Sequence, residues 1–304
     1  MAYIKQPPIE GESPYKHPLS RFMGGGWVGT IIRLAIGLGL SFYMTHRFGL
    51  GEVHSPAEFG LAFEEITFKA ADGLTLCGWC IPNAGSDRVV VIMHGHGGSM
   101  DWDIHRAPAL HAAGFNVFLF DFRAHGRSEG KAITFGYMER QDVLGAVEFL
   151  RSRGMRRIGL LGFSFGGIAA MLAAPICADI AAVVTDGGPA RMRSAMAARG
   201  KEWGAPHWLA APLAWLTLAM TSVRLRANLF HYEAVRWVGQ ISPRPILFVH
   251  AGHDQYLPDF DDLYAAARPP KEVWFVPEAG HTKVSEVLPE EFQRRIIAFF
   301  TQYL

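Results

Sequence analysis

A serine framed by glycines is the residue of this sequence best suited to covalent chemistry. Residues 162–166 read GFSFG, with Ser164 at the centre. An apolar run at 158–161 precedes this segment and a stretch rich in small residues, 167–170, follows it, a pattern that predicts a strand, a sharp turn and a helix. Glycines suit so tight a turn because a side chain there would collide with neighbouring backbone. Ser164 is therefore the candidate nucleophile.

A serine hydroxyl is a weak nucleophile, so Ser164 needs a neighbouring base and an acid that orients the base. Open parallel sheets collect functional side chains at the carboxyl ends of their strands. His281 follows the last predicted strand, and Asp254 follows the strand before it. We therefore predict a catalytic triad of Ser164, Asp254 and His281, in the chain order Ser, Asp, His.

Asp186 is an alternative for the acid of the triad, because it stands at the end of the predicted strand 181–185. A single histidine or aspartate in a loop is usually just solvated. Three suitable residue types at the ends of three strands are much harder to obtain by chance. The joint pattern therefore favours the catalytic interpretation.

A glycine-rich segment, HGHGG at residues 94–98, directly follows the hydrophobic run 89–93. Acyl transfer develops an oxyanion, which needs preorganised donors such as two backbone N–H groups. We predict that the oxyanion hole consists of the amides of Phe165 and His96, with Gly97 as the alternative to His96. A phosphate-binding loop is disfavoured because the segment lacks both the GKS/T ending and the GxGxxG spacing.

Short apolar runs alternate with helix-length segments from residue 64 onward. We expect strands at 64–69, 74–81, 89–93, 117–120, 158–161, 181–185, 245–250 and 272–276, and helices at about 102–113, 138–151 and 290–303. This alternation predicts an α/β fold with a mostly parallel central sheet covered by helices on both faces, and a hairpin adding an antiparallel edge. The apolar insertion at about 189–240 is interpreted as a helical cap over the carboxyl edge of the sheet.

Together these motifs resemble those of serine hydrolases with the α/β-hydrolase fold. The resemblance rests on HGHGG at 94–98, DFRAHGRS at 121–128, GFSFG at 162–166, Asp254 and His281. The 121–128 segment and the antiparallel lead-in are similar to membrane-associated Bem46-like and ABHD13-like members. This resemblance implies that Asp121 and Arg123 brace the site and are not reactants. The dehalogenase and epoxide-hydrolase branches resemble this fold but carry an aspartate where Ser164 stands.

The N-terminal region precedes the predicted hydrolase domain. Residues 1–26 are rich in proline and basic side chains, which predicts a flexible, positively charged tail. Residues 27–47 include a long apolar run with Arg33 as its one charge, so we predict a single-pass transmembrane anchor there. A buried helix is the alternative that Arg33 favours. The excess of basic residues before the helix predicts that the catalytic domain lies on the non-cytoplasmic side of the membrane.

The composition limits the other classes of function. The 304 residues, half of them hydrophobic, suffice for one large domain, which we place at 60–304 with its cap. A formal net charge of +1 gives no reason to expect a nucleic-acid partner. Cys77 and Cys80 fall on a predicted strand, too far apart for a disulfide, and no second pair suggests a metal site.

These features together predict a membrane-anchored enzyme that cleaves carboxylic esters through an acyl-enzyme. An apolar cap beside a membrane favours small-molecule or lipid substrates with a lipophilic acyl group. The mechanism requires neither a metal nor an organic cofactor. A thioesterase or amidase would use the same triad, and a non-catalytic membrane-anchored binding protein is the alternative from a different class. The sequence leaves the oligomeric state open.

Overall fold

The computed structural model describes residues 26–49 and 54–304. The flexible tail predicted at 1–26 therefore lies, apart from its last residue, outside the described residues.

An eight-stranded sheet forms the centre of the described chain, and its strand order is β1-β2-β4-β3-β5-β6-β7-β8. The strands are β1 (Glu64–Lys69), β2 (Thr75–Ile81), β3 (Arg88–Met93), β4 (Asn116–Phe120), β5 (Arg157–Phe163), β6 (Ile180–Asp186), β7 (Ile246–His253) and β8 (Lys271–Gly280). Strand β2 pairs antiparallel with both β1 and β4, and all the other neighbours are parallel. The predicted mostly parallel sheet with an antiparallel edge is confirmed.

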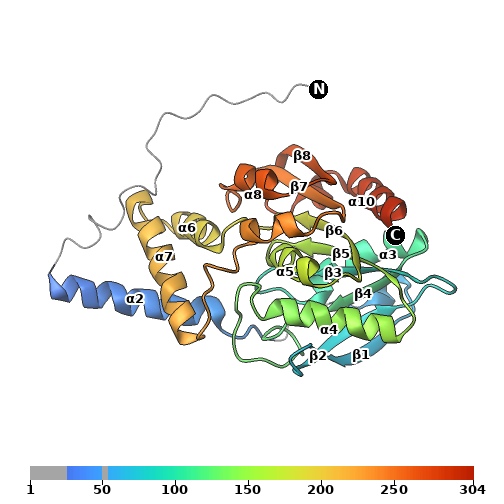
Figure 1. Cartoon of the computed structure of the whole chain (residues 1–304), viewed down its shortest axis with the longest axis horizontal. Helices are drawn as coiled ribbons and strands as arrows, with labels where there is room; N and C mark the ends of the chain where they lie inside the picture. Colours follow the sequence, from blue (N-terminus) through green and yellow to red (C-terminus); the bar gives the residue numbers. More distant parts are fainter. Residues whose placement is uncertain (1–25, 50–53) are drawn as a thin grey trace.

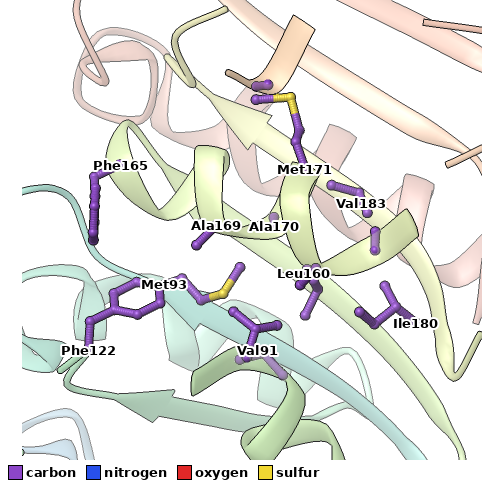
Figure 2. Close-up of a cluster of buried hydrophobic side chains, with 14 of the residues drawn as sticks. Val91, Met93, Phe122, Leu160, Phe165, Ala169, Ala170, Met171, Ile180 and Val183 are labelled. Carbon is purple, nitrogen blue, oxygen red and sulfur yellow. The ribbon is translucent and has the colours of Figure 1, made fainter. Parts of the chain in front are cut away.

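Strand β3 shows how one hydrophobic run serves both faces of the sheet. Alternate residues of a strand point to opposite sides. Val89, Val91 and Met93 belong to the core that α4 (Glu139–Ser152) and α5 (Phe165–Ala173) cover, as Figure 2 shows for Val91 and Met93 beside α5. Val90 and Ile92 belong to the core on the other face, which α10 (Pro289–Tyr303) covers.

Apart from the N-terminal helix, which is described below, the remaining helices outside α6 (Met192–Glu202) and α7 (His207–Arg224) are short. They are α3 (Ala107–Ala112), α8 (Phe260–Ala266) and α9 (Val284–Val287). Short 3-10 helices lie at Pro56–Phe59, Met100–Arg106, Ala174–Ile176, Ala234–Arg236 and Val238–Gln240. The helix predicted at 102–113 is thus a 3-10 segment followed by α3. The 3-10 segment follows the loop after β3, and its residues Trp102 and Asp103 line the cavity described below.

The segment predicted to form a cap contains two helices, α6 (Met192–Glu202) and α7 (His207–Arg224). They pack against each other and stand at one end of the molecule, beyond the sheet (Figure 1). Figure 1 also shows α2 (Trp27–Thr45) crossing α7 there.

The transmembrane anchor predicted at 27–47 is not supported. Residues 27–45 do form a helix, α2, but among residues 26–49 and 54–304 no helix has both the length and the hydropathy that crossing a membrane requires. Arg33 lies within α2, and the helix packs on α7 with Ser41 and Thr45 fully buried. The buried polar side chains near its C-terminal end and the arginine within it are typical of a helix that packs against protein.

Candidate active site

Ser164 stands at a strained turn between β5 and α5. Its φ of 50° and ψ of −110° are unusual for a residue with a side chain, so the surrounding fold must hold this conformation. A Cβ at Gly162 would lie 2.5 Å from the carbonyl carbon of Gly166, and a Cβ at Gly166 would lie 2.3 Å from the carbonyl oxygen of Met93. Both glycines of the GFSFG segment are therefore needed for close backbone packing. The sequence-based reason for these glycines is confirmed.

Ser164, His281 and Asp254 form one chain of hydrogen bonds. The Oγ of Ser164 lies 2.8 Å from Nε2 of His281, and Nδ1 of His281 lies 2.7 Å from Oδ2 of Asp254. An ionised carboxylate only accepts hydrogen bonds, so Nδ1 carries the hydrogen and Nε2 is left to accept from the serine hydroxyl. The amide of Tyr256 donates to the second oxygen, Oδ1 of Asp254, at 2.9 Å. Asp254 is thus held on both oxygens.

The three side chains come from the carboxyl ends of three parallel strands. Ser164 follows β5, Asp254 follows β7 and His281 follows β8. This common origin brings together residues that are 117 and 27 positions apart in the chain. Parallel strands deliver their carboxyl ends to one edge, and that edge is where open α/β sheets build their sites.

Asp186, the alternative acid, is near this group but does not bond to His281. Its backbone oxygen accepts the amide of Ser164 at 2.7 Å. Its carboxylate is fully buried and has no hydrogen-bond partner in the part of the chain that the structure describes. Burial raises the pKa of Asp186 to about 8, so its carboxyl is largely neutral at pH 7. The residue bonded to His281 is Asp254.

Two backbone amides near Ser164 are candidates for the predicted oxyanion hole. Phe165 is the first residue of α5, where an N–H has no partner within the helix. The amide of Gly97, the alternative donor, already donates to Nε2 of His125 at 3.2 Å. Within the described residues the amide of His96 donates to no protein group, and both His96 and Phe165 line a cavity together with Ser164. The geometry therefore favours His96 over Gly97.

Histidine side chains fix the loop that carries these amides. Nε2 of His96 lies 2.9 Å from the carbonyl oxygen of Met44 at the end of α2, and because a carbonyl only accepts, this nitrogen carries the hydrogen. His94 accepts the amide of Phe122 at Nε2, 3.1 Å away. Burial lowers the pKa of His96 and His94, and it lowers the pKa of His125 to about 2, so all three rings are neutral.

The 121–128 segment braces this loop, as the resemblance implied. Oδ1 of Asp121 accepts the amide of Met100 at 2.9 Å, which ties the segment to the chain just after HGHGG. Arg123 donates to both carboxylate oxygens of Asp72 at 2.9 Å and also bonds to the buried Asp142. These contacts occupy both side chains and leave neither exposed in the cavity at Ser164.

A profile of the alpha/beta hydrolase family matches residues 89–295 of this chain. The chain belongs to the alpha/beta hydrolase family. Among curated relatives, it is 32% identical to the uncharacterized protein YfhR of Salmonella typhimurium over 230 residues, which is 72% of this chain and 74% of that protein. It is 28% identical to the uncharacterized protein YqkD of Bacillus subtilis over 223 residues, 71% of this chain and 72% of that protein.

Similar structures have been solved for proteins described as esterases. The structure superimposes on the esterase Pf2001 of Pyrococcus furiosus with a TM-score of 0.72 and 25% identity, covering 86% of this chain and 98% of that one. The match supports a hydrolase, and the similarity extends over nearly the whole of the esterase.

The site of this hydrolase also includes residues that sequence reasoning missed. The cavity at Ser164, here called the site cavity, has a volume of about 220 Å³. Met44 from α2, Arg199 from α6 and Tyr256 after β7 line it. The Tyr256 ring packs edge-on to the ring of His281, with 4.7 Å between centroids. Tyr256 lies only two positions after Asp254, which is the one sequence signal that could have found it; Met44 and Arg199 carry none, because tertiary packing alone brings α2 and α6 here.

Proposed function

We propose that this hydrolase cleaves carboxylic esters of lipophilic acids through an acyl-enzyme on Ser164. The observation that carries the proposal is the unbroken chain of hydrogen bonds from Ser164 to His281 to Asp254 at the wall of the site cavity. The similarity to an enzyme described as an esterase supports ester chemistry in this chain as well.

The proposed reaction follows from the order of the bonds. His281 takes the proton of the Ser164 hydroxyl at Nε2 as Oγ attacks the ester carbonyl carbon. Asp254 keeps the imidazole in the required tautomer and stabilises the cation that forms. The amides of Phe165 and His96 bind the oxyanion of the tetrahedral intermediate. His281 then gives its proton to the departing alcohol, and a water molecule, activated in the same way, releases the acid.

A matched substrate series tests the type of bond that is cleaved. We expect the oxygen ester of a fixed acyl group to have a higher kcat/KM than the thioester or the anilide of the same acyl group. For the anilide, the reason is that His281, the general acid of the proposed mechanism, must protonate an amine leaving group far more completely than an alcohol. For the thioester, the expectation rests on the similarity to an enzyme described as an esterase. The measurement is steady-state hydrolysis of all three substrates by the same preparation.

The outcomes of that series separate the alternatives. A clear preference for the thioester would replace the esterase proposal with a thioesterase. No turnover of any of the three, across short and long acyl groups, would instead favour a binding protein that keeps the fold. An inactive Ser164→Ala preparation serves as the control for contaminating esterases.

The exposed side chains of α2 are the feature that supports a contact with a lipid surface. Large apolar side chains on α2 are exposed, among them Trp27, Ile31 and Ile32, and Trp208 on the neighbouring α7 is exposed as well. Exposed apolar side chains on a helix that follows a basic stretch of sequence are typical of interfacial helices. We propose that this face binds anionic lipid, consistent with the predicted resemblance to membrane-associated members. The side of the membrane on which the domain lies stays a prediction.

Flotation with vesicles tests the lipid contact. We expect the protein to float with vesicles of phosphatidylcholine and phosphatidylglycerol, and the double variant Ile31→Glu/Ile32→Glu to lower the affinity by about tenfold for each isoleucine lost. Val287→Glu is the matched control, because Val287 is equally an exposed aliphatic residue but lies on α9. Absence of flotation for the parent protein, or an equal loss in the Val287→Glu control, would contradict the proposal.

A further inference from the structure

A second cavity adjoins the site cavity beneath the cap helices. Its volume is about 390 Å³, larger than the 220 Å³ of the site cavity. Met44, Met196 and Arg199 line both cavities. The two spaces therefore meet at these three side chains, and a ligand that extends from Ser164 past them would enter the second cavity.

Residues of three helices line the second cavity. The lining comprises Ile36, Leu40 and Met44 of α2, Met196, Arg199 and Gly200 of α6, Ala210, Leu213, Ala214 and Thr217 of α7, and Trp203, Gly204 and Ala205 of the turn between α6 and α7. Several of the cap residues are glycine or alanine, and these small residues leave room between α6 and α7. Almost every lining side chain is apolar, and the guanidinium of Arg199 is paired with Glu202 at 2.8 Å.

Helix α2 forms a fixed wall of the second cavity. At its crossing with α7, a Cβ on Gly37 would lie only 2.8 Å from Cγ of Leu216, so glycine permits the close approach of the two helices. Beyond this crossing, the hydroxyl of Thr221 donates to Oγ of Ser41 at 2.9 Å, and Nε of Arg224 donates to the same oxygen at 3.1 Å. These contacts hold α2 against the cap.

We propose that the second cavity binds the unbranched acyl chain of the substrate. This proposal rests on the ester hydrolysis proposed above. The lining offers an aliphatic chain many apolar contacts and few polar ones. Met44 indicates which part of the ester enters. Its carbonyl oxygen bonds to the ring of His96, whose amide is the proposed oxyanion donor, and Met44 also lines the second cavity. The departing alcohol takes its proton from His281, so the acyl part is the one that continues toward Met44.

A substitution that fills the second cavity tests this proposal. Ala214 lines the second cavity and not the site cavity. In the parent protein we expect kcat/KM to be higher for p-nitrophenyl decanoate than for p-nitrophenyl acetate. In Ala214→Phe we expect the decanoate-to-acetate ratio of kcat/KM to fall by about 100-fold, which corresponds to the loss of three to four buried methylenes at about fourfold each. Turnover of the acetate should be unchanged, because its acyl group ends near Ser164.

Two further variants support the test: one fills the cavity from another position, and one is a control outside both cavities. Leu213→Trp fills the same cavity from a half-buried position, so it decides the question if Ala214→Phe does not fold. Ala219→Phe is the matched control, because Ala219 is on the same helix and lines neither cavity. We expect the control to keep the parent ratio. A parent ratio in the folded cavity variants, or the same fall in the Ala219→Phe control, would overturn the proposal.

A pair of esters in which the long chain is on the acyl part or on the alcohol part tests which part enters the second cavity. If the second cavity takes the acyl chain, ethyl decanoate should lose kcat/KM in Ala214→Phe, whereas decyl acetate should not. A selective loss for decyl acetate would overturn the acyl assignment in favour of the alcohol.

A binding measurement separates this proposal from the proposed catalysis. We expect a folded Ser164→Ala protein to bind the fluorescent long-chain fatty acid cis-parinaric acid, and the double variant Ser164→Ala/Ala214→Phe to lose that binding. Equal binding by both would overturn the acyl cavity. Failure of the parent protein to hydrolyse any ester would count against the proposed function alone, since binding does not require turnover.

Discussion

Replacing Ser164 with alanine is expected to lower kcat/KM for ester hydrolysis by about 10⁴-fold to 10⁶-fold, the range found when a triad nucleophile is removed. The physical reason is that Oγ of Ser164 is the atom that His281 activates, at 2.8 Å, and no other hydroxyl bonds to His281 within the described residues. The measurement is steady-state hydrolysis of a p-nitrophenyl ester by purified parent and variant proteins.

The matched control for this substitution is Ser152→Ala. Ser152 is an exposed serine at the end of α4, and its hydroxyl donates to the carbonyl oxygen of Phe149. We expect its hydrolysis rate to equal that of the parent. If Ser164→Ala retained the parent rate while folded, Ser164 would not be the nucleophile and the proposed mechanism would be wrong.

Asp254→Asn is expected to lower kcat by about 10⁴-fold, because an amide in this position favours the wrong tautomer of the catalytic histidine. Asp254 accepts the hydrogen on Nδ1 of His281 at 2.7 Å, and an asparagine can turn its NH₂ group toward that nitrogen. The same change at Asp186 should leave the rate near that of the parent, because the Asp186 carboxyl does not contact His281. A greater loss in Asp186→Asn than in Asp254→Asn would reverse the assignment of the acid.

Asp186→Asn is also expected to change how the stability of the protein depends on pH. Burial raises the pKa of Asp186 to about 8 in the folded protein, whereas the unfolded chain has a value of about 4. The folded state therefore holds the proton more tightly, and the contribution of this group to the free energy of unfolding falls as pH rises from about 4 to 8. The decrease in Tm between pH 5 and pH 8 should accordingly be smaller in Asp186→Asn than in the parent. An equal decrease would show that Asp186 does not carry the effect.

Much of the fold was predictable because each buried strand is a distinct apolar run. The run 89–93 is buried on both faces, as its unbroken hydrophobicity indicated, and β1 begins and ends at the predicted residues. The candidate triad was predictable for a related reason: parallel topology assigns the carboxyl end of each strand to one edge. Position along the chain was then enough to select Asp254 and His281 from many acids and histidines.

The role of α2 was not predictable from the same patterns. An apolar run of about 18 residues reads as a membrane span, yet in the structure α2 packs on α7. What determines this packing is tertiary: Gly37 fits against Leu216, and Ser41 finds partners in Thr221 and Arg224, residues about 180 positions later in the chain. Hydropathy averages over a helix and does not register which single positions make contacts.

The bond from His96 to Met44 was missed for the same reason. The sequence predicts that the 94–98 loop supplies an oxyanion donor, and His96 of this loop lines the cavity at Ser164. It did not indicate that the His96 side chain would bond to the end of α2. Helix α2 thereby contacts the 94–98 loop and also lines the second cavity.

Covalent labelling with a fluorophosphonate tests the central claim, that Ser164 is the activated nucleophile, most directly. A fluorophosphonate reacts much faster with a serine that a neighbouring base activates than with an ordinary hydroxyl. Intact-mass measurement of the parent protein should show one adduct, peptide mapping should place it on Ser164, and hydrolysis of esters should cease as the adduct accumulates. An adduct on another residue, or full hydrolytic activity in protein that carries the adduct on Ser164, would contradict the claim.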